Sequence, residues 1–278
     1  MNLKIYKSLW GMTGNLEEQF ARVAEAGYDG VESAVEEIGD AEKFKTLLRK
    51  YNLDYIPLIY TEGANHLENF RQLIGMAATF KPKKIVAHAG RDLWSFSEQV
   101  NFFEKALLIE KEFGIPIAHE THRRRPLFSP MNMVALMREL PDLKINADLS
   151  HWCCVTESML EDHAEAIELA AKRAIHIHCR VGYENGPQVP DPRAPEWAEH
   201  LTKSESWWKM ILDEHVKRGE EDLTITPEYG PPSYMQTIPF ENKPVADLWE
   251  VCLWSVERFR KMFHHVISNG ALSEERNL

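Results

Sequence analysis

Four segments of this sequence that read as strands each end on a side chain able to bind a divalent cation. The set comprises three carboxylates and one imidazole, at Glu120, Asp148, His178 and Glu228. The stretches between them are each long enough for a strand–helix unit, so neighbouring strands deliver successive members. Oxygen and imidazole ligands without a thiolate suit Mn²⁺, Mg²⁺, Co²⁺ or Zn²⁺. These four residues therefore predict a site for one divalent metal ion.

The histidine of this set lies in AIHIHCRV, residues 174–181. Alternation along a strand places His176 and His178 on the same face. A buried imidazole costs free energy unless it is hydrogen-bonded or bound to a metal. The pair is therefore either a core histidine beside one at the strand mouth, or part of a metal site. The carboxylates at the other strand ends favour the metal site.

Polar residues close to these strand ends are candidates for proton transfer and substrate binding. His151 follows Asp148 by three residues and can turn back toward the site. His88 ends another strand and is interpreted as a further ligand, a substrate contact or a core residue. Arg180 shares the strand face of His178, where it either holds a substrate oxyanion or neutralises the carboxylates. We favour the first role for Arg180.

Loop residues near the strand ends complete the candidate site. Trp10 and Tyr183 lie near loop starts and are predicted to stack on a sugar ring, with packing as the alternative. The basic run 122–125 follows the strand of Glu120. Such a run is usually a solvated face, but its position leaves an anionic or phosphorylated substrate open. His119 has the opposite parity to Glu120, and we expect it to face the helix layer.

Eight strand-like segments alternate with helical segments along the chain. The strands are expected at residues 3–12, 29–34, 53–60, 84–90, 115–121, 143–150, 174–181 and 223–230. The helices are expected at residues 16–26, 40–51, 64–80, 96–113, 130–139, 158–172 and 205–218, and in an apolar stripe from 245 to 259. Such alternation implies a parallel sheet, and no GxGxxG motif follows the first strand. We therefore predict a single-domain (β/α)8 TIM barrel over residues 1–265 and a polar tail over residues 266–278.

Two long loops are expected after the last two strands. Residues 182–203 contain too many Gly and Pro for regular structure, and a loop of this length is typically functional. Residues 231–243, PPSYMQTIPFENK, form the second loop. Because barrel enzymes select substrates at the end where the strand C-termini meet, we expect the first loop to contribute to substrate selection.

The composition limits the classes of protein to which the chain belongs. The sequence has 278 residues, of which 44% are hydrophobic, and a formal net charge of −11. This charge argues against a protein that binds nucleic acid, since affinity for a phosphate backbone comes mostly from Lys and Arg. No apolar run has the length of a signal peptide core or a membrane span, so we expect a cytoplasmic location. The four cysteines lack a CxxC spacing, which argues against a thiolate zinc site.

At the candidate ligands the sequence resembles the xylose isomerase-like barrels. This superfamily includes sugar phosphate isomerases and epimerases, ketose 3-epimerases, inositol-catabolism isomerases and dehydratases, and apurinic endonucleases. The resemblance covers nearly the whole chain and rests on HETH with Glu120, ADLSH with Asp148 and His151, HIHCR with His178, and TPEYG with Glu228. It implies one Mn²⁺ or similar ion that chelates neighbouring substrate oxygens, with Glu120 and Glu228 moving the proton on opposite faces. It also implies that His151 contacts the substrate and that Arg180 orients it.

Two departures from the superfamily pattern narrow the function. Ketose epimerases carry another glutamate six residues after the glutamate of strand 5, and Pro126 occupies that position here. This argues against a sugar epimerase of that subgroup. The endonuclease relatives use three zinc ions and an Asp-x-His in the loop after strand 7, whereas this loop offers Asp191-Pro192-Arg193. The missing histidine and the negative charge argue against DNA repair.

The candidate site predicts chemistry at a carbon next to a carbonyl. A cation bound to a carbonyl and its neighbouring hydroxyl stabilises the enediolate that forms when a base removes the α-proton. We therefore expect a divalent-metal-dependent isomerase or epimerase of a small sugar, keto-sugar or polyol, with Mn²⁺ preferred over Mg²⁺, Co²⁺ or Zn²⁺. A lyase or dehydratase on a keto-sugar or keto-inositol is the first alternative. A phosphodiesterase or nuclease and a non-catalytic sugar-binding barrel follow.

The expected roles of the individual residues complete the sequence-based hypothesis. The predicted catalytic residues are Glu120, Glu228 and His151. The predicted substrate-binding residues are Arg180, His88, Trp10 and Tyr183. The expected partner is a small-molecule sugar, with no nucleic acid and no membrane, and the chain is compatible with a homo-oligomer. The sequence leaves open which sugar is bound, whether it is phosphorylated, and whether it is isomerised, epimerised or dehydrated.

Overall fold

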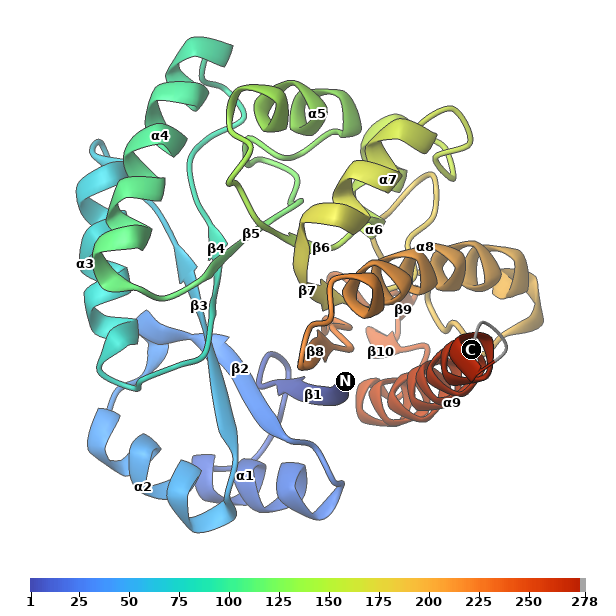
Figure 1. Cartoon of the computed structure of the whole chain (residues 1–278). Coiled ribbons are helices and arrows are strands. Elements are labelled where there is room, and N and C mark those ends of the chain that lie inside the picture. The colour runs from blue at the N-terminus through green and yellow to red at the C-terminus, as the bar shows by residue number, and fades with distance from the viewer. Residues whose placement is uncertain (276–278) are drawn as a thin grey trace.

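Eight parallel strands close into a barrel in sequence order, with β8 pairing to β1 (Figure 1). The structure is a computed structural model that describes residues 1–275, with side chains through residue 268. The barrel strands are β1 (Asn2–Ser8), β2 (Gly30–Ala34), β3 (Asp54–Tyr60), β4 (Ile85–His88), β5 (Ile117–Glu120), β6 (Ile145–Ala147), β7 (Ala174–His178) and β8 (Asp222–Thr226). This confirms the predicted single-domain (β/α)8 barrel.

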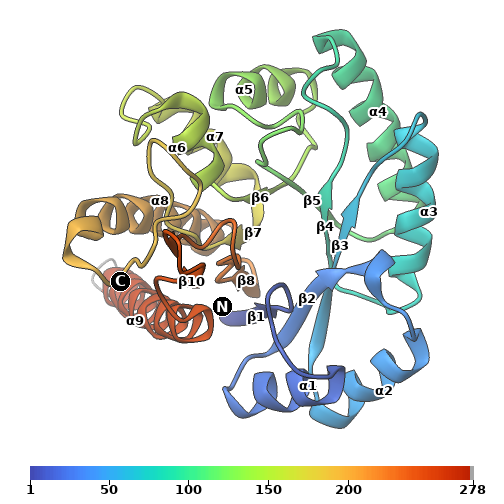
Figure 2. The same ribbon diagram turned by 180° about the vertical axis from the view of Figure 1, so that it is seen from behind.

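Helices surround the barrel, as the two opposite views in Figures 1 and 2 show. They are α1 (Leu16–Glu25), α2 (Ala41–Tyr51), α3 (His66–Ala78), α4 (Phe96–Phe113), α5 (Pro130–Glu139), α6 (Ser150–Thr156), α7 (Ala164–Arg173), α8 (Ala198–Lys217) and α9 (Leu248–Glu275). Two short 3₁₀ helices, η1 (Val35–Glu37) and η2 (Pro195–Trp197), precede α2 and α8. In the described part of the chain, no helix is both long and apolar enough to cross a membrane.

Local sequence signals set several of the helix ends. Asn15 caps α1 in a capping box with Glu18, and Ser95 caps α4 in the same way with Glu98. Each box satisfies backbone N–H groups that have no partner inside the helix. Gly114 ends α4 in the left-handed conformation, with a φ of 66°, which a glycine adopts without steric cost. The N-caps therefore mark where the chain enters α1 and α4, and Gly114 marks where it leaves α4.

Two different environments lie on the two sides of the barrel wall. Outside it, apolar side chains pack between strands and helices, as where Phe20 of α1 meets Phe44 of α2 at 5.1 Å between ring centroids. The apolar cluster inside the barrel is smaller, and its members are Tyr6, Ile56, Leu58, Val86 and Ala118. Polar side chains share the interior with that cluster. Among them, Lys84 donates to Thr224 Oγ1 at 2.9 Å and His176 lies 2.8 Å from the same hydroxyl.

Several regions differ from the sequence-based expectation. Strand β6 ends at Ala147, and helix α6 begins at Ser150 instead of the strand continuing to that residue. The Ser150 backbone N–H donates to Asp148 Oδ1 at 3.1 Å, a local bond that turns the chain out of the strand. Helix α8 begins at Ala198, inside the segment 182–203 that was expected to be irregular. Leu201, in the first turn of this helix, is buried.

The segment after β8 is also more ordered than its sequence suggested. It forms a short antiparallel pair, β9 (Thr237–Ile238) with β10 (Lys243–Pro244), and in Figure 2 this pair lies close to β8. A two-residue pair is too short to give an alternating pattern in the sequence. Helix α9 continues to Glu275, past the boundary at residue 265 placed between barrel and tail. Residues 276–278 of that predicted tail lie outside the described residues.

The close approach of Gly182 to α6 gives a test of how the fold positions the site. A Cβ at Gly182 would lie 2.7 Å from Ser150 Cα and 2.8 Å from Ser150 O, which are backbone atoms. We expect Gly182→Ala to lower the free energy of unfolding by about 1–3 kcal/mol, the usual cost of overpacking. It should also weaken metal binding, because Ser150 holds Asp148.

Urea unfolding and metal titration measure the two effects. Gly75→Ala is the control, since Gly75 lies within α3 and a Cβ there has nothing within 4 Å. That change should instead stabilise the protein by about 0.5–1 kcal/mol, because alanine favours helix over glycine. Equal stability of the Gly182 variant and the control would contradict this account.

Candidate metal centre

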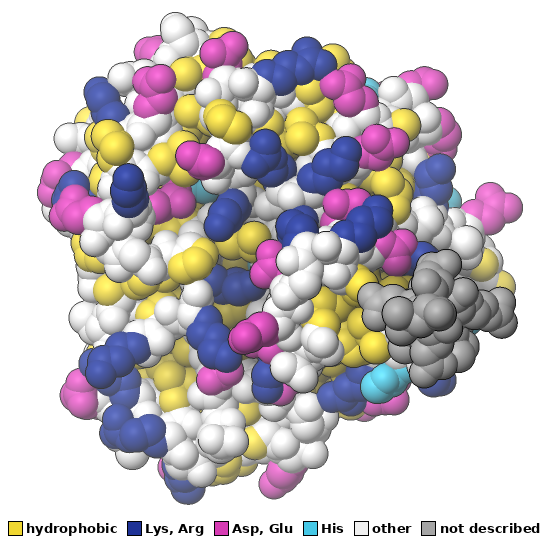
Figure 3. All heavy atoms as spheres, viewed as in Figure 1, with side chains coloured by type: hydrophobic (Ala, Val, Ile, Leu, Met, Phe, Trp, Pro, Cys, Tyr) yellow, Lys and Arg dark blue, Asp and Glu magenta, His cyan; other side chains and the backbone are white. Residues whose placement is uncertain are grey.

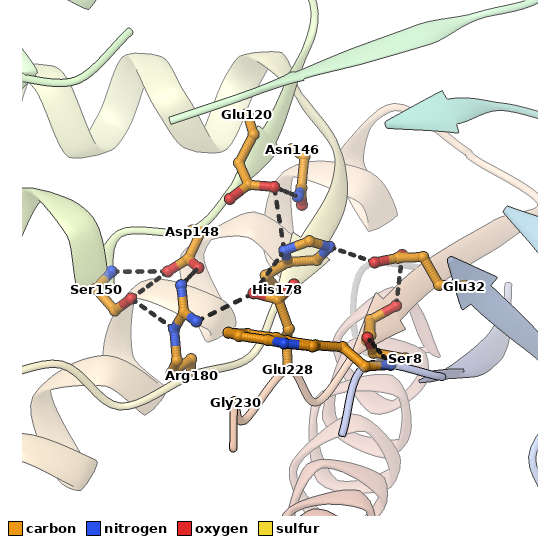
Figure 4. Close-up of polar contacts among 12 residues, drawn as sticks. Ser8, Glu32, Glu120, Asn146, Asp148, Ser150, His178, Arg180, Glu228 and Gly230 are labelled. Carbon is orange, nitrogen blue, oxygen red and sulfur yellow. Dashed lines mark hydrogen bonds and ion pairs between the residues drawn. The ribbon is translucent and has the colours of Figure 1, made fainter. Parts of the chain in front are cut away.

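The structure brings the four predicted ligands together at the C-terminal ends of consecutive strands. Glu120 and His178 are the last residues of β5 and β7. Asp148 directly follows β6, and Glu228 lies two residues beyond β8. One oxygen or nitrogen from each residue lies within 4.8 Å of the others, and all four residues are buried. Figure 4 shows the four side chains converging on one point.

Three atoms of this cluster are buried without a hydrogen-bond partner. They are Glu120 Oε1 and both ring nitrogens of His178. The His178 Nδ1 atom lies 3.2 Å from Glu120 Oε2 and 3.4 Å from Glu228 Oε2. Buried polar atoms in proteins are normally satisfied, and leaving one unpaired costs free energy. Glu120 Oε1 and His178 Nδ1 lie unsatisfied among carboxylates, as a divalent cation with oxygen and nitrogen ligands requires, so the residues fit the predicted metal.

The guanidinium of Arg180 is the cation that faces these carboxylates. It pairs with Asp148 Oδ2 through Nη2, with Glu228 Oε2 through Nη1 at 3.2 Å, and donates from Nε to Ser150 Oγ at 3.1 Å. Figure 4 shows it between Asp148 and Glu228. Of the two roles considered for Arg180, these contacts display charge neutralisation. Arg180 also lines the cavity described below, so its predicted role toward substrate stays a prediction.

The cluster carries more negative charge than its surroundings balance. Burial raises the pKa of Asp148 to about 6, although Arg180 acts in the opposite direction. Burial also raises the pKa of Glu120, and Glu228 adds to that shift. Burial opposes ionisation of Glu228 as well, but His178 and Arg180 together hold its pKa below the usual value. Several carboxylates thus compete for one imidazole and one guanidinium, a situation that a bound divalent cation relieves.

A fourth carboxylate, that of Glu32, lies at the other nitrogen of the His178 ring. Glu32 of β2 places Oε1 2.9 Å from His178 Nε2, and its Oε2 accepts from Thr226 Oγ1 at 2.8 Å. The same Oε2 lies 3.1 Å from His176 Nε2. Burial disfavours the charge, but His178 and His176 lower the pKa of Glu32 to about 2. Glu32 therefore orients the ring so that Nδ1 faces the other ligands, as carboxylates behind metal-binding histidines do.

Three further histidines adjoin Glu120. His88 places Nε2 2.8 Å from Glu120 Oε2. The ring of His122 lies 4.5 Å from that of His88 and 4.0 Å from that of His151. Burial lowers the pKa of His88 and of His122 to about 3 and that of His151 well below its usual value. All three imidazoles are therefore neutral near pH 7.

The predicted catalytic residue His151 lies in the cluster. Its Nε2 is 3.7 Å from Asp148 Oδ2 and 3.8 Å from Glu120 Oε1. Arg180 Nη2 approaches the same Nε2 at 2.8 Å. Because a guanidinium only donates, Nε2 of His151 accepts this bond, and the ring proton lies on Nδ1. This contact fixes the tautomer of His151.

A cavity of about 940 Å³ extends from the metal centre over the ends of β1 to β4. Its lining includes Glu228, Arg180, His88 and His122 beside the cluster, and Trp10 further along. Trp10 packs edge to face on Tyr234, with ring centroids 5.0 Å apart. Tyr234 also lies under Arg180, whose Cζ is 5.1 Å from the ring. The cavity thus gives a small molecule access to one side of the ligand set.

Two of the predicted residue positions lie away from this cavity. The Tyr183 ring packs on Trp197 at 5.1 Å, and Tyr183 is absent from the described residues that line the cavity. His119 faces the helix layer as its parity predicted, with Nε2 2.8 Å from Glu110 Oε1 of α4. In contrast, the structure brings Arg180, His88 and Trp10 to the cavity as expected.

The sequence-based hypothesis missed Glu32 and His122. His122 was placed in a basic run of a kind that is usually a solvated face, with an anionic or phosphorylated substrate left open. It has the same parity as Glu120, two residues earlier, and that parity indicates an inward position. Glu32 lies near the end of the predicted second strand. Its signal is a charged residue with the inward parity of a strand whose neighbour Val31 packs on the helix layer. Asn146, which donates to Glu120 Oε2 at 3.0 Å, carried no distinct signal.

The family model for xylose isomerase-like TIM barrels matches residues 20–220 of this sequence. The chain belongs to this family. No curated protein matches the sequence. The family assignment agrees with the resemblance seen in the ligand motifs, and the described barrel supplies all eight of the family's expected strands.

Solved structures share the fold of this family member at low sequence identity. A xylose isomerase-like TIM barrel protein from Mycobacterium smegmatis in complex with magnesium has 13% identity and a TM-score of 0.61, with 94% of this chain and 96% of that chain covered. A probable 3-DHS dehydratase from Bacillus anthracis has 17% identity and a TM-score of 0.58, with 83% and 94% covered. A sugar phosphate isomerase/epimerase from Parabacteroides distasonis has 11% identity and a TM-score of 0.55, with 83% and 87% covered.

The contact between Glu32 and His178 predicts a measurable effect on metal affinity. We expect Glu32→Gln to lower the affinity for Mn²⁺ at least about tenfold, because residues that orient ligating histidines typically contribute 10- to 100-fold. Competition with a chelating dye measures the affinity. Glu110→Gln is the matched control, since Glu110 pairs with a buried histidine that faces the helix layer. The account fails if both variants bind Mn²⁺ equally well.

Proposed function

We propose that this protein is a divalent-metal-dependent enzyme that isomerises or epimerises a small sugar, keto-sugar or polyol. The observation that carries the proposal is the buried set of three carboxylates and one histidine at one end of a cavity of about 940 Å³. The proposal includes a cytoplasmic location and a small-molecule substrate. Mn²⁺ is the proposed metal, and the magnesium bound in the Mycobacterium smegmatis protein supports a hard divalent ion in this fold.

The residues that would hold the metal are Glu120, Asp148, His178 and Glu228. When bound, a divalent cation supplies Lewis-acid polarisation of a carbonyl and its neighbouring hydroxyl. This polarisation makes the proton on the carbon that bears the hydroxyl more acidic. The unsatisfied atoms of Glu120 and His178 and the excess of buried carboxylate support this assignment.

The chain's own carboxylates supply the base for proton abstraction. Glu228 lines the cavity, and its low pKa keeps it ionised. Glu120 and Glu228 both approach His178 Nδ1, at 3.2 and 3.4 Å, and we propose that the two carboxylates act on opposite faces of the substrate. A base within hydrogen-bond reach of an acidified carbon-bound proton removes it in the first step. Return of the proton from the opposite side epimerises the carbon, and return to the adjacent carbon isomerises the sugar.

Neutral histidines favour a dehydratase as the second candidate function. His88 and His122 line the same cavity and are uncharged near pH 7. A neutral imidazole can take up a proton from one carbon and deliver it to a departing β-hydroxyl. The fold similarity to the probable 3-DHS dehydratase accords with this alternative, which shares its first step with isomerisation.

The shared first step predicts exchange with solvent deuterium. Incubated in D₂O with Mn²⁺ and its substrate from a ketose panel, the protein should place deuterium on the carbon next to the carbonyl. Glu228→Gln should slow this exchange at least about 100-fold, the usual contribution of a general base. NMR at saturating metal measures the exchange.

The control for this experiment is Glu184→Gln. Glu184 pairs with His200 at 3.1 Å and is partly exposed, so its replacement should leave the exchange rate unchanged. Turnover with neither solvent deuterium nor a primary isotope effect from α-deuterated substrate would point to a hydride shift or hydrolysis. That result would refute proton abstraction.

A prediction about DNA separates this proposal from an endonuclease. We expect no metal-dependent incision of abasic-site DNA and no tight binding at physiological salt. A chain of net charge −11 lacks the basic surface that would release counterions from DNA. On the face shown in Figure 3, Lys and Arg side chains are interspersed with Asp and Glu and form no continuous basic surface. Gel assays with Mn²⁺, Mg²⁺ and Zn²⁺ test this expectation. Incision with any of the three ions would favour the endonuclease alternative.

A further inference from the structure

The cavity beside the metal centre has arginines on one wall. Arg91 follows β4, and Arg123 and Arg124 follow β5. Within the described residues, none of these three side chains forms an ion pair with Asp or Glu. The chain has a net charge of −11, yet these three guanidiniums without an acidic partner line one cavity. Such groups recognise carboxylate and phosphate oxygens.

The loop that carries this wall is held in a defined conformation. Arg125 donates from Nη1 to the carbonyls of Thr61 and Gly90, at 3.0 Å each, and so ties the loop to the ends of β3 and β4. Arg124 has a φ of 66°, a left-handed conformation that costs free energy for any residue other than glycine. Arg125 is thus the structural member of the basic run. The fixed loop leaves Arg123 and Arg124 at the cavity.

The arginine wall adjoins the metal centre. Arg123 lies over the ring of Tyr234, with Cζ 5.2 Å from the centroid, and Arg180 lies 5.1 Å from the same centroid. The two guanidiniums are therefore no further apart than the sum of those distances. Arg180 in turn contacts Asp148 and Glu228. One small molecule can reach from the metal ligands to the arginines.

Acidic residues line the same cavity on other loops. Glu37 and Asp40 follow β2, and Glu62 follows β3. Asp40 caps α2 through a bond from the Lys43 backbone N–H at 2.9 Å. The cavity is therefore lined by acidic residues from the β2 and β3 loops and by arginines from the β4 and β5 loops. The β5 loop also carries His122, and Arg123 and Arg180 lie against the same Tyr234 ring.

We propose that Arg91, Arg123 and Arg124 form an anion subsite that holds a phosphate or carboxylate group of the substrate while its carbonyl end lies at the metal centre. This inference rests on the proposed function and narrows it to acidic keto-sugars. An anionic group on the arginines restricts rotation of the substrate and directs one end toward Glu228. A neutral sugar of the same size lacks this restraint and binds more weakly.

The test compares three ketoses with the full-length protein in Mn²⁺. The probes are D-fructose, D-fructose 6-phosphate and 5-keto-D-gluconate, which are neutral, phosphorylated and carboxylated. We expect at least one anionic ketose to bind tenfold or more tightly than D-fructose by calorimetry. A preference for the phosphate identifies a phosphorylated substrate, and a preference for the keto acid identifies a carboxylate. Each of these results supports the subsite.

Variants assign the effect to the arginine wall. Arg91→Gln combined with Arg124→Gln should remove the advantage of the anionic ketose over D-fructose. Thermal unfolding should change little, because neither side chain forms an ion pair in the described structure. Lys43→Gln combined with Arg49→Gln, at two exposed positions of α2, is the control for the loss of two positive charges, and it should keep the full advantage.

Two results would overturn the anion subsite. One is similar or undetectable binding of all three ketoses. The other is an anionic advantage that persists in the double variant. Neither result bears on the deuterium exchange experiment. A protein that exchanges deuterium into a neutral ketose without anionic preference keeps its proposed function and loses the subsite. A protein that prefers the anionic ketose without exchanging deuterium keeps the subsite and loses the proposed function.

Discussion

The imidazole of His178 lies between carboxylates on both of its nitrogens, and much of the barrel interior is arranged around that contact. Glu32 approaches Nε2 at 2.9 Å, while Glu120 and Glu228 approach Nδ1 at 3.2 and 3.4 Å. Carboxylates buried this closely repel one another unless cations balance them. Arg180 supplies one positive charge. The remaining imbalance makes the position next to Nδ1 electrostatically favourable for a divalent ion.

The barrel provides the two environments that this contact needs. The outer apolar layer binds the helices to the strands and fixes the strand ends, where Glu120 and His178 lie on the strands and Asp148 and Glu228 lie within two residues of them. The interior then carries polar groups in sequence from one end to the other. Lys84 and His176 share Thr224, and His176 shares Glu32 with His178. Hydrogen bonds join Lys84, Thr224, His176 and Glu32 in this series, and an ion pair joins Glu32 to His178.

The sequence was sufficient to predict elements with strong periodicity and the residues that end them. Eight strands, the barrel and the positions of Glu120, Asp148 and His178 follow from alternation and from the meeting of parallel strand ends. Segments that depend on tertiary contacts were not predictable. The β9–β10 pair is too short for a pattern in the sequence. Helix α8 begins at Ala198, earlier than the Gly- and Pro-rich segment before it indicated. His122 was missed because its basic neighbours suggested solvent, although Arg125 turns that run inward through backbone carbonyls.

A divalent ion held by the four proposed ligands would share carboxylate oxygens with Arg180. Arg180 takes Asp148 Oδ2 and Glu228 Oε2, and Ser150 donates to Asp148 Oδ1. His88 and Asn146 share Glu120 Oε2. Glu120 Oε1 and His178 Nδ1 are left without hydrogen bonds, and they are therefore the atoms from which a metal displaces nothing. Binding through the other two carboxylates costs part of the Arg180 pairing. Under the proposed function, one guanidinium would link substrate chemistry to metal affinity, because Arg180 contacts Asp148 and Glu228 and also lines the cavity.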